Sequence, residues 1–354
     1  MDKFQIMKNL QKLAIRKASL TTLALLGMGV GVAVSSSPAS AALFVKDTFN
    51  NAALSIDGFG STSNNGFIRT NVPTGSTVRK AYLYASSIWN FSPVSNVRLN
   101  GNLLQVSDAT VLTPDLNPAT TVRWDVTSLL GSLGGLQSHT IEELGDNDGA
   151  VLVVAYENED TLGFTSVILD GELSTGGDET TFNFAQPYTS GDFLVSLASS
   201  FSFQPANQFT TIDVTTNSTS SRRLTSSAGG QDDGSGDNGA LITVGGIDDS
   251  PTNPDPFATD AGGPRTDDEY YNLALGNTAN PNPFINPGDK FIKLTTRNPS
   301  NDDNVFGLFV TSTFRITTEP PTDIPEPSVT LGTLVFAAFG ANSLLKRKQK
   351  KVAN

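Results

Sequence analysis

Acidic residues in short segments rich in Gly, Ser and Asn are the part of this sequence best suited to hold a metal ion. One segment combines Asp232, Asp233 and Asp237 with glycines that allow the backbone to bend around an ion. Calcium takes about six to eight oxygen ligands, often from closely spaced Asp and Asn. The segment lacks the spacing and the distal Glu of an EF-hand loop, so we expect either a calcium site of another kind or a solvated acidic loop. Further acidic clusters are Asp146-Asn147-Asp148, Asp248-Asp249, Asp267-Asp268-Glu269 and Asn301-Asp302-Asp303-Asn304.

Residues for acid–base or nucleophilic catalysis are scarce. The chain has no Cys, and His139 is its single histidine, which excludes thiolate chemistry and metal sites built from several imidazoles. A Ser-His-Asp triad would need His139 as its base, and no G-x-S-x-G turn presents a nucleophile. Paired carboxylates could hydrolyse glycosides, but acidic pairs are too common here to indicate this. We therefore predict that the protein is not an enzyme, and that His139 is a polar residue near the start of a strand.

Two tryptophans are candidates for stacking on a sugar ring. Trp124 lies in a strand-like run, which favours burial in the core. Trp89 is followed by Asn90 and Phe91 at the end of another run, which favours exposure. Trp89 is thus the better candidate for a carbohydrate contact.

The elements that must position these residues are β-strands. Short runs rich in β-branched and aromatic residues alternate with Gly, Asn, Asp and Pro, and helical periodicity is scarce. Asn100-Gly101 between two runs predicts a two-residue type I′ hairpin turn, and the apolar run 150–156 predicts a central strand. We expect an all-β fold, an antiparallel β-sandwich or jelly roll with long acidic loops at about 216–239 and 246–286. One continuous sandwich over residues 42–322 is favoured, with a subdivision near residue 216 as the alternative.

The N-terminal 41 residues have the pattern of a secretory signal peptide. Five basic residues precede an uncharged, mostly apolar run from Leu20 to Val34, and Ala39-Ser40-Ala41 follows it. A basic start, a short apolar middle and an A-x-A-like end predict export, with cleavage near Ala41-Ala42. The alternative is an uncleaved anchor, but the run is shorter than the ~18 residues of a membrane span.

The C-terminal segment 323–354 has the pattern of a membrane anchor. Pro325-Glu326-Pro327 leads into an uncharged stretch at 329–345, and five basic residues follow between 346 and 351. A stretch of this length is at the lower limit for a transmembrane helix, and the basic cluster should remain on the cytoplasmic side. A buried core helix is the alternative.

These C-terminal residues resemble the PEP-CTERM sorting signal, in which Ile324 stands where the usual pattern has Val. The resemblance implies that an exosortase, a membrane transpeptidase-like protease, recognises Pro325, Glu326 and Pro327 and removes the span after Ser328. It also implies a bacterium that makes exopolysaccharide and biofilm matrix. A second, weaker resemblance, to jelly-roll surface and carbohydrate-binding domains, lies in Lys80–Tyr84, Val97–Gly101 and Asp125–Leu130.

The net charge of the chain indicates which classes of partner it can bind. The chain has a formal net charge of −12, and removing the signal and the basic tail leaves −20 for residues 42–323. So acidic a body would repel nucleic acid, while cations and neutral sugars remain plausible ligands. We predict an exported protein that is anchored in the inner membrane before processing and then lies at the cell surface or in the extracellular matrix. Its role would be structural or adhesive; the alternative is a calcium-assisted carbohydrate-binding module.

Overall fold

The computed structural model describes residues 43–60, 63–87, 93–112, 120–173, 177–200, 210–228, 242–253, 256, 269–297 and 304–318. Within these ranges the chain forms antiparallel β-strands and short 3₁₀ turns, so the predicted all-β antiparallel fold is confirmed. The predicted signal helix and C-terminal transmembrane helix lie outside the described ranges. Inside them, no helix has the length and apolar character needed to span a membrane.

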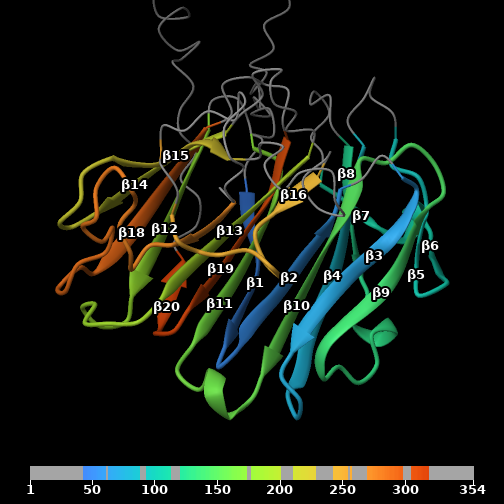
Figure 1. The fold of residues 1–354 in the computed structure, drawn as a ribbon, viewed down its shortest axis with the longest axis horizontal. Helices are drawn as coiled ribbons and strands as arrows, with labels where there is room; N and C mark the ends of the chain where they lie inside the picture. The colour runs from blue at the N-terminus through green and yellow to red at the C-terminus, as the bar shows by residue number, and fades with distance from the viewer. Residues whose placement is uncertain are drawn as a thin grey trace, which may run out of the picture. The chain divides into compact units, whose positions relative to one another are not determined.

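The strands form four sheets stacked in the order outer sheet 1, inner sheet 1, inner sheet 2, outer sheet 2, from right to left in Figure 1. Inner sheet 1 has the order β2-β10-β4-β8-β7, with β2 (Ala53–Phe59), β4 (Thr77–Ser87), β7 (Thr110–Val111), β8 (Thr120–Asp125) and β10 (Gly149–Glu157). Outer sheet 1 has the order β3-β9-β5-β6, with β3 (Asn65–Val72), β5 (Val97–Leu99), β6 (Asn102–Leu104) and β9 (Gly135–Glu143).

The second pair of sheets is built from the later strands and from the first one. Inner sheet 2 has the order β1-β11-β19-β13-β16, and β17 also pairs with β13; the strands are β1 (Leu43–Asn50), β11 (Thr165–Gly171), β13 (Phe193–Ser200), β16 (Ile242–Val244), β17 (Tyr270–Asn272) and β19 (Asn304–Ser312). Outer sheet 2 has the order β15-β14-β18-β12-β20, with β12 (Asp178–Phe184), β14 (Thr210–Thr216), β15 (Arg222–Ala228), β18 (Phe291–Arg297) and β20 (Ile316–Thr318).

The two sandwiches repeat one topology. The first sandwich contains eight strands that we number 1 to 8 in chain order: β2, β3, β4, β5, β6, β8, β9 and β10. They form one sheet with the order 1-8-3-6 and a second sheet with the order 2-7-4-5. In the second sandwich, β11 to β15 are strands 1 to 5, β16 or β17 is strand 6, and β18 and β19 are strands 7 and 8. Its two sheets then have the same two orders. This is the arrangement of a jelly roll, so the described residues form two consecutive jelly rolls with β1 and β20 added at sheet edges.

The sequence pattern led us to favour one continuous sandwich, and the structure differs from that expectation. The chain passes from the first sandwich to the second after β10, through the 3₁₀ turn η4 (Glu159–Thr161). Residue 216, the alternative point of subdivision, is the last residue of β14, inside the second sandwich. Alternating polarity identifies strands and their buried faces, but it does not say which sheet a strand will join.

Strand β1 comes before the first sandwich in the chain but pairs with β11 of the second. The link to β2 consists of Asn51 and Ala52, and Asn51 has a positive φ of 59°, which Asn tolerates better than most residues. The Asn51 backbone N–H donates to the Phe164 carbonyl (2.9 Å), and the Thr161 hydroxyl donates to the Asn51 carbonyl (2.7 Å). The first strand therefore fastens the two sandwiches together.

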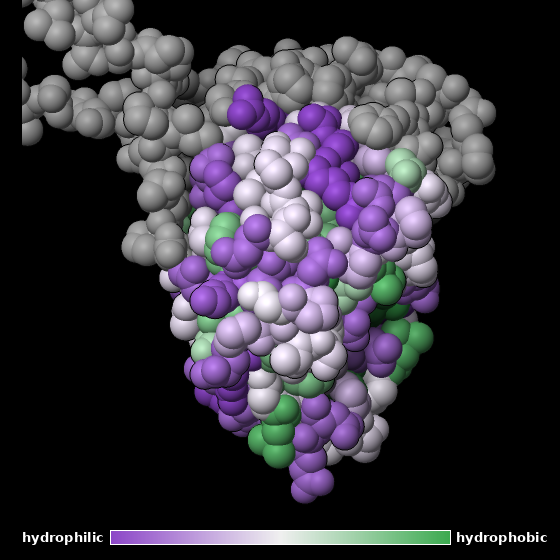
Figure 2. Space-filling view, turned by 90° about the vertical axis from the view of Figure 1, so that its left-hand side faces the viewer, coloured by the Kyte–Doolittle hydropathy of each residue, from purple (hydrophilic) through white to green (hydrophobic). Residues whose placement is uncertain are grey.

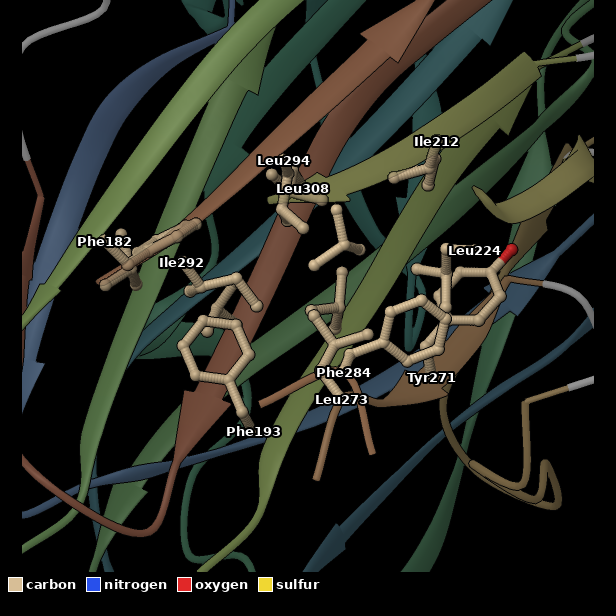
Figure 3. Packing of buried hydrophobic residues seen from close by; sticks show 14 of the residues in the cluster. Phe182, Phe193, Ile212, Leu224, Tyr271, Leu273, Phe284, Ile292, Leu294 and Leu308 are labelled. Atoms are coloured by element: carbon tan, nitrogen blue, oxygen red, sulfur yellow. The ribbon is translucent and has the colours of Figure 1, made fainter. Parts of the chain in front are cut away.

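Three hydrophobic clusters occupy the spaces between adjacent sheets. The first sandwich encloses Leu83, Trp124 and Ile141 among others. The second encloses an aromatic and aliphatic cluster that includes Phe182 and Phe193 (Figure 3). A third lies between the inner sheets, where the Tyr84 ring is 5.9 Å from Phe306 and 5.8 Å from Phe309 between centroids.

Two local predictions are confirmed in detail. Asn100 and Gly101 connect β5 to β6 and have φ values of 50° and 76°, the two positive values of a type I′ turn. The run 150–156 forms most of β10, in the middle of inner sheet 1, with both faces covered. Strand β4 beside it is also buried on both faces, since Tyr82 and Tyr84 face the second sandwich while Leu83 faces the core of the first.

Candidate functional site

Several strands of both sandwiches begin or end at one shared end of the molecule. The Ser86 hydroxyl at the end of β4 donates to Ser200 at the end of β13 (3.0 Å). Gly60 and Gly149, next to β2 and at the start of β10, lie against Ile242 at the start of β16. We call this the loop-bearing end, defined by the last residues of β2, β4 and β13 and the first residues of β10 and β16. The acidic cluster Asp146-Asn147-Asp148 connects β9 to β10 there.

Glu143 is a buried carboxyl group at this end. In β9 the exposed and buried residues alternate, and Glu143 faces inward together with Ile141 and His139. Its side chain is 3% exposed, and its Oε1 atom has no hydrogen-bond partner among the described residues. Burial, followed by the negative charge of Asp148, raises the pKa of Glu143 to about 8. Glu143 is therefore protonated at neutral pH unless a cation offsets its charge.

The segment that follows Glu143 is held by side-chain amides. Asn147 Oδ1 accepts from the Ser95 backbone N–H (2.7 Å), and Asn147 Nδ2 donates to the Ser95 carbonyl (3.2 Å). Asn64 Nδ2 donates to the carbonyls of Glu143 (3.4 Å) and Gly145 (3.2 Å). These bonds hold the backbone between β9 and β10 in place.

A second acidic group surrounds Arg69 where the two sandwiches meet. The Arg69 side chain donates to both carboxylate oxygens of Asp57 in β2, at 3.2 Å each, and also pairs with Asp248, which follows β16. The neighbouring Asp249 accepts from the Gly246 backbone N–H. Burial raises the pKa of Asp57 to about 6 against the lowering effect of Arg69. Burial also raises the pKa of Asp249, and the charges of Asp57 and Asp248 add to this.

A third polar cluster is centred on Arg123 of β8. It connects the two sandwiches on the opposite side of their interface from Arg69. Arg123 pairs with Asp170 of β11, and both side chains are at most 10% exposed. The Tyr84 hydroxyl donates to Asp170 Oδ2 (2.9 Å), and the Tyr82 hydroxyl donates to Asp47 of β1. These bonds join β4 and β8 of the first sandwich to β1 and β11 of the second.

Most of the predicted site residues lie outside the described ranges. These are the calcium candidates Asp232, Asp233 and Asp237, the carbohydrate candidate Trp89, and the sorting residues Pro325, Glu326 and Pro327. Within the described ranges, no group of three or more His, Cys, Asp or Glu side chains is arranged to hold a metal ion. The calcium and carbohydrate sites thus remain predictions.

The structure places the two remaining candidates in buried surroundings. The Asn100 amide donates to His139 Nδ1 (3.0 Å), which leaves Nε2 to donate to the Thr70 hydroxyl (3.0 Å), and burial lowers the pKa of the ring. The hydrogen bonds found for His139 thus go to an amide and a hydroxyl. Trp124 is buried in the first sandwich, and its Nε1–H donates to the Gln105 carbonyl (2.8 Å).

Sequence reasoning missed the residues that carry these clusters, namely Asp57, Arg69, Arg123, Glu143 and Asp170. A signal was present for one of them. Asp170 follows the otherwise uncharged run 165–169, whereas Glu143 shares its face of β9 with Gln137 and His139, so no apolar pattern marks it. Charged residues in such positions are almost always paired or functional. The partners come from distant strands and have no counterpart in the local pattern.

Comparison with solved structures finds distant similarity. Neither a protein-family model nor a curated protein sequence matches the chain. Among solved structures, the chain is similar to the major capsid protein P2 from bacteriophage PM2, with 13% identity and a TM-score of 0.20, over 75% of this chain and 98% of that chain. A TM-score this low carries no argument about this protein.

Proposed function

We propose that the chain is an exported bacterial protein of the cell surface or extracellular matrix with a structural or adhesive role, processed at Pro325-Glu326-Pro327 by an exosortase-type protease. The direction of the terminal strands supports this proposal most. The Leu43 backbone N–H at the start of β1 donates to Asp178 Oδ2 at the start of β12 (2.8 Å). Strand β20 pairs antiparallel with the same strand β12 and therefore runs toward Asp178.

The chain therefore enters β1 and leaves β20 at the same end of the second sandwich, where β12 begins. Segments that precede β1 and follow β20 would reach the membrane from one side of the body. Until the signal is cleaved, this arrangement lets both membrane segments leave the folded part on one side; after cleavage, the segment that follows β20 alone would hold the body at the bilayer. The proposal also agrees with the polar connections that fasten the two sandwiches on both flanks of their interface.

The surface of the second sandwich suits a role in an aqueous matrix. Figure 2 views the molecule from the side on which β14 and β18 lie in Figure 1, and the described surface there is mostly hydrophilic, with apolar residues scattered. Lys293 pairs with Glu179 (2.9 Å) and Arg223 with Asp213 (2.8 Å) across neighbouring strands of this sheet. A polar surface of this kind remains soluble after release from the membrane.

Processing in a bacterium that produces an exosortase tests the proposal. The wild-type chain and a variant with Pro325→Ala, Glu326→Ala and Pro327→Ala are compared by cell fractionation and by mass spectrometry of the mature protein. We expect the wild type to begin near Ala42, to lose the span after Ser328 and to reach the surface fraction. The variant should keep its tail and remain in the inner membrane.

The matched control is Pro320→Ala with Pro321→Ala, which alters prolines just before the motif and should be processed like the wild type. A strain without the exosortase should treat the wild type as it treats the motif variant. Retention of residues 1–41 in the mature wild type would contradict cleavage of a signal peptide, and absence of the wild type from the surface fraction would contradict export. Identical processing of the wild type and the motif variant would contradict sorting.

A further inference from the structure

The first described strand begins beside a buried carboxylate. Leu43, the first residue of β1, is 1% exposed, and its side chain packs in the core of the second sandwich. Its backbone N–H donates to Asp178 Oδ2 (2.8 Å), although β1 belongs to inner sheet 2 and Asp178 begins β12 of outer sheet 2. This hydrogen bond therefore joins the two sheets of the second sandwich at the point where the chain enters β1.

Asp178 has an interior position in which a positive charge would be strongly attracted. Its exposed fraction is 6%, and its Oδ1 atom accepts from the Glu179 backbone N–H (2.7 Å). Buried acidic side chains are rarely left without a compensating charge, and the attraction between opposite charges is stronger where water is excluded. A cation placed at the beginning of β1 would therefore be stabilised by this carboxylate.

Cleavage between Ala41 and Ala42 creates a positive charge at this point of the chain. Hydrolysis of that peptide bond leaves a carboxylate on Ala41 and an ammonium group on Ala42, the residue directly before Leu43. Ala42 itself lies outside the described ranges, but consecutive backbone nitrogens are separated by at most about 4 Å. Because the Leu43 nitrogen is 2.8 Å from Asp178 Oδ2, the new ammonium group is within reach of that oxygen.

We propose that Asp178 binds the α-ammonium group that signal cleavage creates on Ala42, so that processing fixes the first strand of the mature protein. This inference rests on the cleavage at Ala41-Ala42 that belongs to the proposed function. In the uncleaved chain the Ala42 nitrogen is part of a neutral peptide bond and carries one hydrogen. After cleavage it carries a positive charge and three donor hydrogens, as the ammonium group of a lysine does.

The ion pair would act on the strand that fastens the two sandwiches together. Strand β1 pairs with β11 of the second sandwich, and its Asp47 accepts from the Tyr82 hydroxyl of the first. An ion pair between the beginning of β1 and the beginning of β12 opposes separation of β1 from outer sheet 2. A chain whose amino terminus lies at Ala42 should therefore be more stable than one whose amino terminus lies further upstream.

Two chains that begin at different residues test the proposal without relying on processing in the cell. One begins at Ala42 and the other at Ala39, and each is released from a fusion by a protease that leaves no additional residue. Both end at Asn354 and are studied in the same detergent. The three extra residues of the longer chain move its ammonium group away by up to roughly 10 Å. Asp178→Asn is introduced into both chains, and Asn keeps an oxygen that can accept from the Leu43 N–H.

We expect Asp178→Asn to raise the equilibrium constant for unfolding about tenfold more in the chain that begins at Ala42 than in the longer chain, because only the shorter one loses an ion pair. Urea unfolding at pH 6.5, where amino groups are protonated, measures both. The matched control is Glu179→Gln, which neutralises the next acid in β12 and removes its pair with Lys293. It should change the stability of the two chains equally.

A second measurement needs no variant of Asp178. An amine-reactive label at pH 7, located by mass spectrometry, should modify the α-amino group more slowly in the chain that begins at Ala42 than in the one that begins at Ala39, because the bound group is shielded. Equal labelling rates would overturn the proposal. An equal effect of Asp178→Asn on the two chains would also overturn it, since Asp178 would then serve the Leu43 N–H alone. Cleavage at another residue in the cell would contradict the proposed processing, whereas these two measurements decide whether Asp178 binds the ammonium group.

Discussion

Two arginines hold the interface between the sandwiches, and their surroundings differ in charge. Arg123 meets one carboxylate, Asp170, whose Oδ2 atom also accepts a hydrogen bond from the Tyr84 hydroxyl. Arg69 binds Asp57 and Asp248 and lies near Asp249, so one positive charge serves three negative ones. Arg123 and Asp170 are almost fully buried, whereas Arg69 is 29% exposed at its side chain.

The difference shows how the same ion pair can act as a permanent connection or as a titratable one. In the Arg123 cluster, burial raises the pKa of Asp170 despite the lowering effect of Arg123, and losing either partner of this pair leaves a charge in the interior. In the Arg69 cluster, burial raises the pKa of Asp57 to about 6 despite Arg69, and the charge of Asp248 adds to this, so the cluster takes up protons as the pH falls. We therefore expect the Arg123 cluster to control stability and the Arg69 cluster to control its pH dependence.

The largest effect should follow from Arg123→Met. The variant leaves the Asp170 carboxylate buried without its cation, and such a change typically costs about 3–5 kcal/mol. Urea unfolding of the wild type and variant at pH 7, followed by tryptophan fluorescence, measures the loss of free energy of unfolding.

Arg98→Met is the matched control, because the Arg98–Glu142 pair is about 40% exposed on both sides and should cost less than about 1 kcal/mol. Replacing both partners, in Arg123→Met with Asp170→Leu, should recover much of the loss, since an apolar pair needs no charge compensation. Equal losses for the two single arginine variants would show that burial does not distinguish the pairs.

A smaller effect is expected on the pH dependence when Asp249 is changed to Asn. Raised pKa values mean that the native state keeps protons on Asp57 and Asp249 at pH values where the unfolded chain, with pKa values near 4, has lost them. The free energy of unfolding should therefore fall as pH rises from about 4 to 7. Asp249→Asn removes one of the titrating groups and should reduce this fall by roughly 1–2 kcal/mol.

The measurement is a series of urea unfolding curves between pH 4 and 7 for the wild type and Asp249→Asn. Asn can still accept the hydrogen bond from the Gly246 backbone N–H, so the local structure should be kept. The groups that face Asp249 are Arg69, Asp57 and Asp248. Parallel curves for the two proteins would show that the Arg69 cluster does not set the pH dependence.

The sequence predicted the all-β fold, one central strand and one turn, whereas β15 and β17 lie inside the two ranges that were expected to be long loops. The unbroken apolar run of β10 reflects burial of both its faces, and Asn100-Gly101 specifies its own turn through positive φ, whereas His139 lies in the middle of β9 and not near a strand start. These features depend on residues that are close in the chain. The apolar run 150–156 therefore predicted the existence of β10 and its central position.

The presence of two jelly rolls and the charged clusters around Arg69 and Arg123 could not be predicted from the sequence in the same way. Pairing of β1 with β11 joins residues more than a hundred positions apart, and no local pattern assigns β1 to the second sandwich. Tyr82 and Tyr84 alternate as in any buried strand, and nothing in that run shows that their hydroxyls meet Asp47 and Asp170. Charged partners on distant strands become visible only once the register of every sheet is known.

Tyr84→Phe tests how far Asp170 depends on its second partner. The Tyr84 ring is fully buried between the inner sheets, and Phe keeps that packing while removing the hydroxyl that donates to Asp170. Loss of one hydrogen bond to a buried charged group should cost about 1–2 kcal/mol, less than Arg123→Met because the ion pair remains. Urea unfolding at pH 7 measures it, and a loss as large as that of Arg123→Met would mean that the hydroxyl and the arginine are equally necessary.

Asp248→Asn should have the smallest effect and completes the comparison. Asp248 is 70% exposed at its side chain, so its pair with Arg69 is screened by water and should contribute less than about 1 kcal/mol. Removing its charge also lessens the repulsion on Asp57 and Asp249, which lowers their pKa values and offsets part of that loss. The net change in the free energy of unfolding at pH 7 should therefore be close to zero or slightly stabilising, as measured by the same urea curves. A loss comparable to that of Arg123→Met would mean that the Arg69 cluster also acts as a permanent connection, and the distinction between the two flanks would fail.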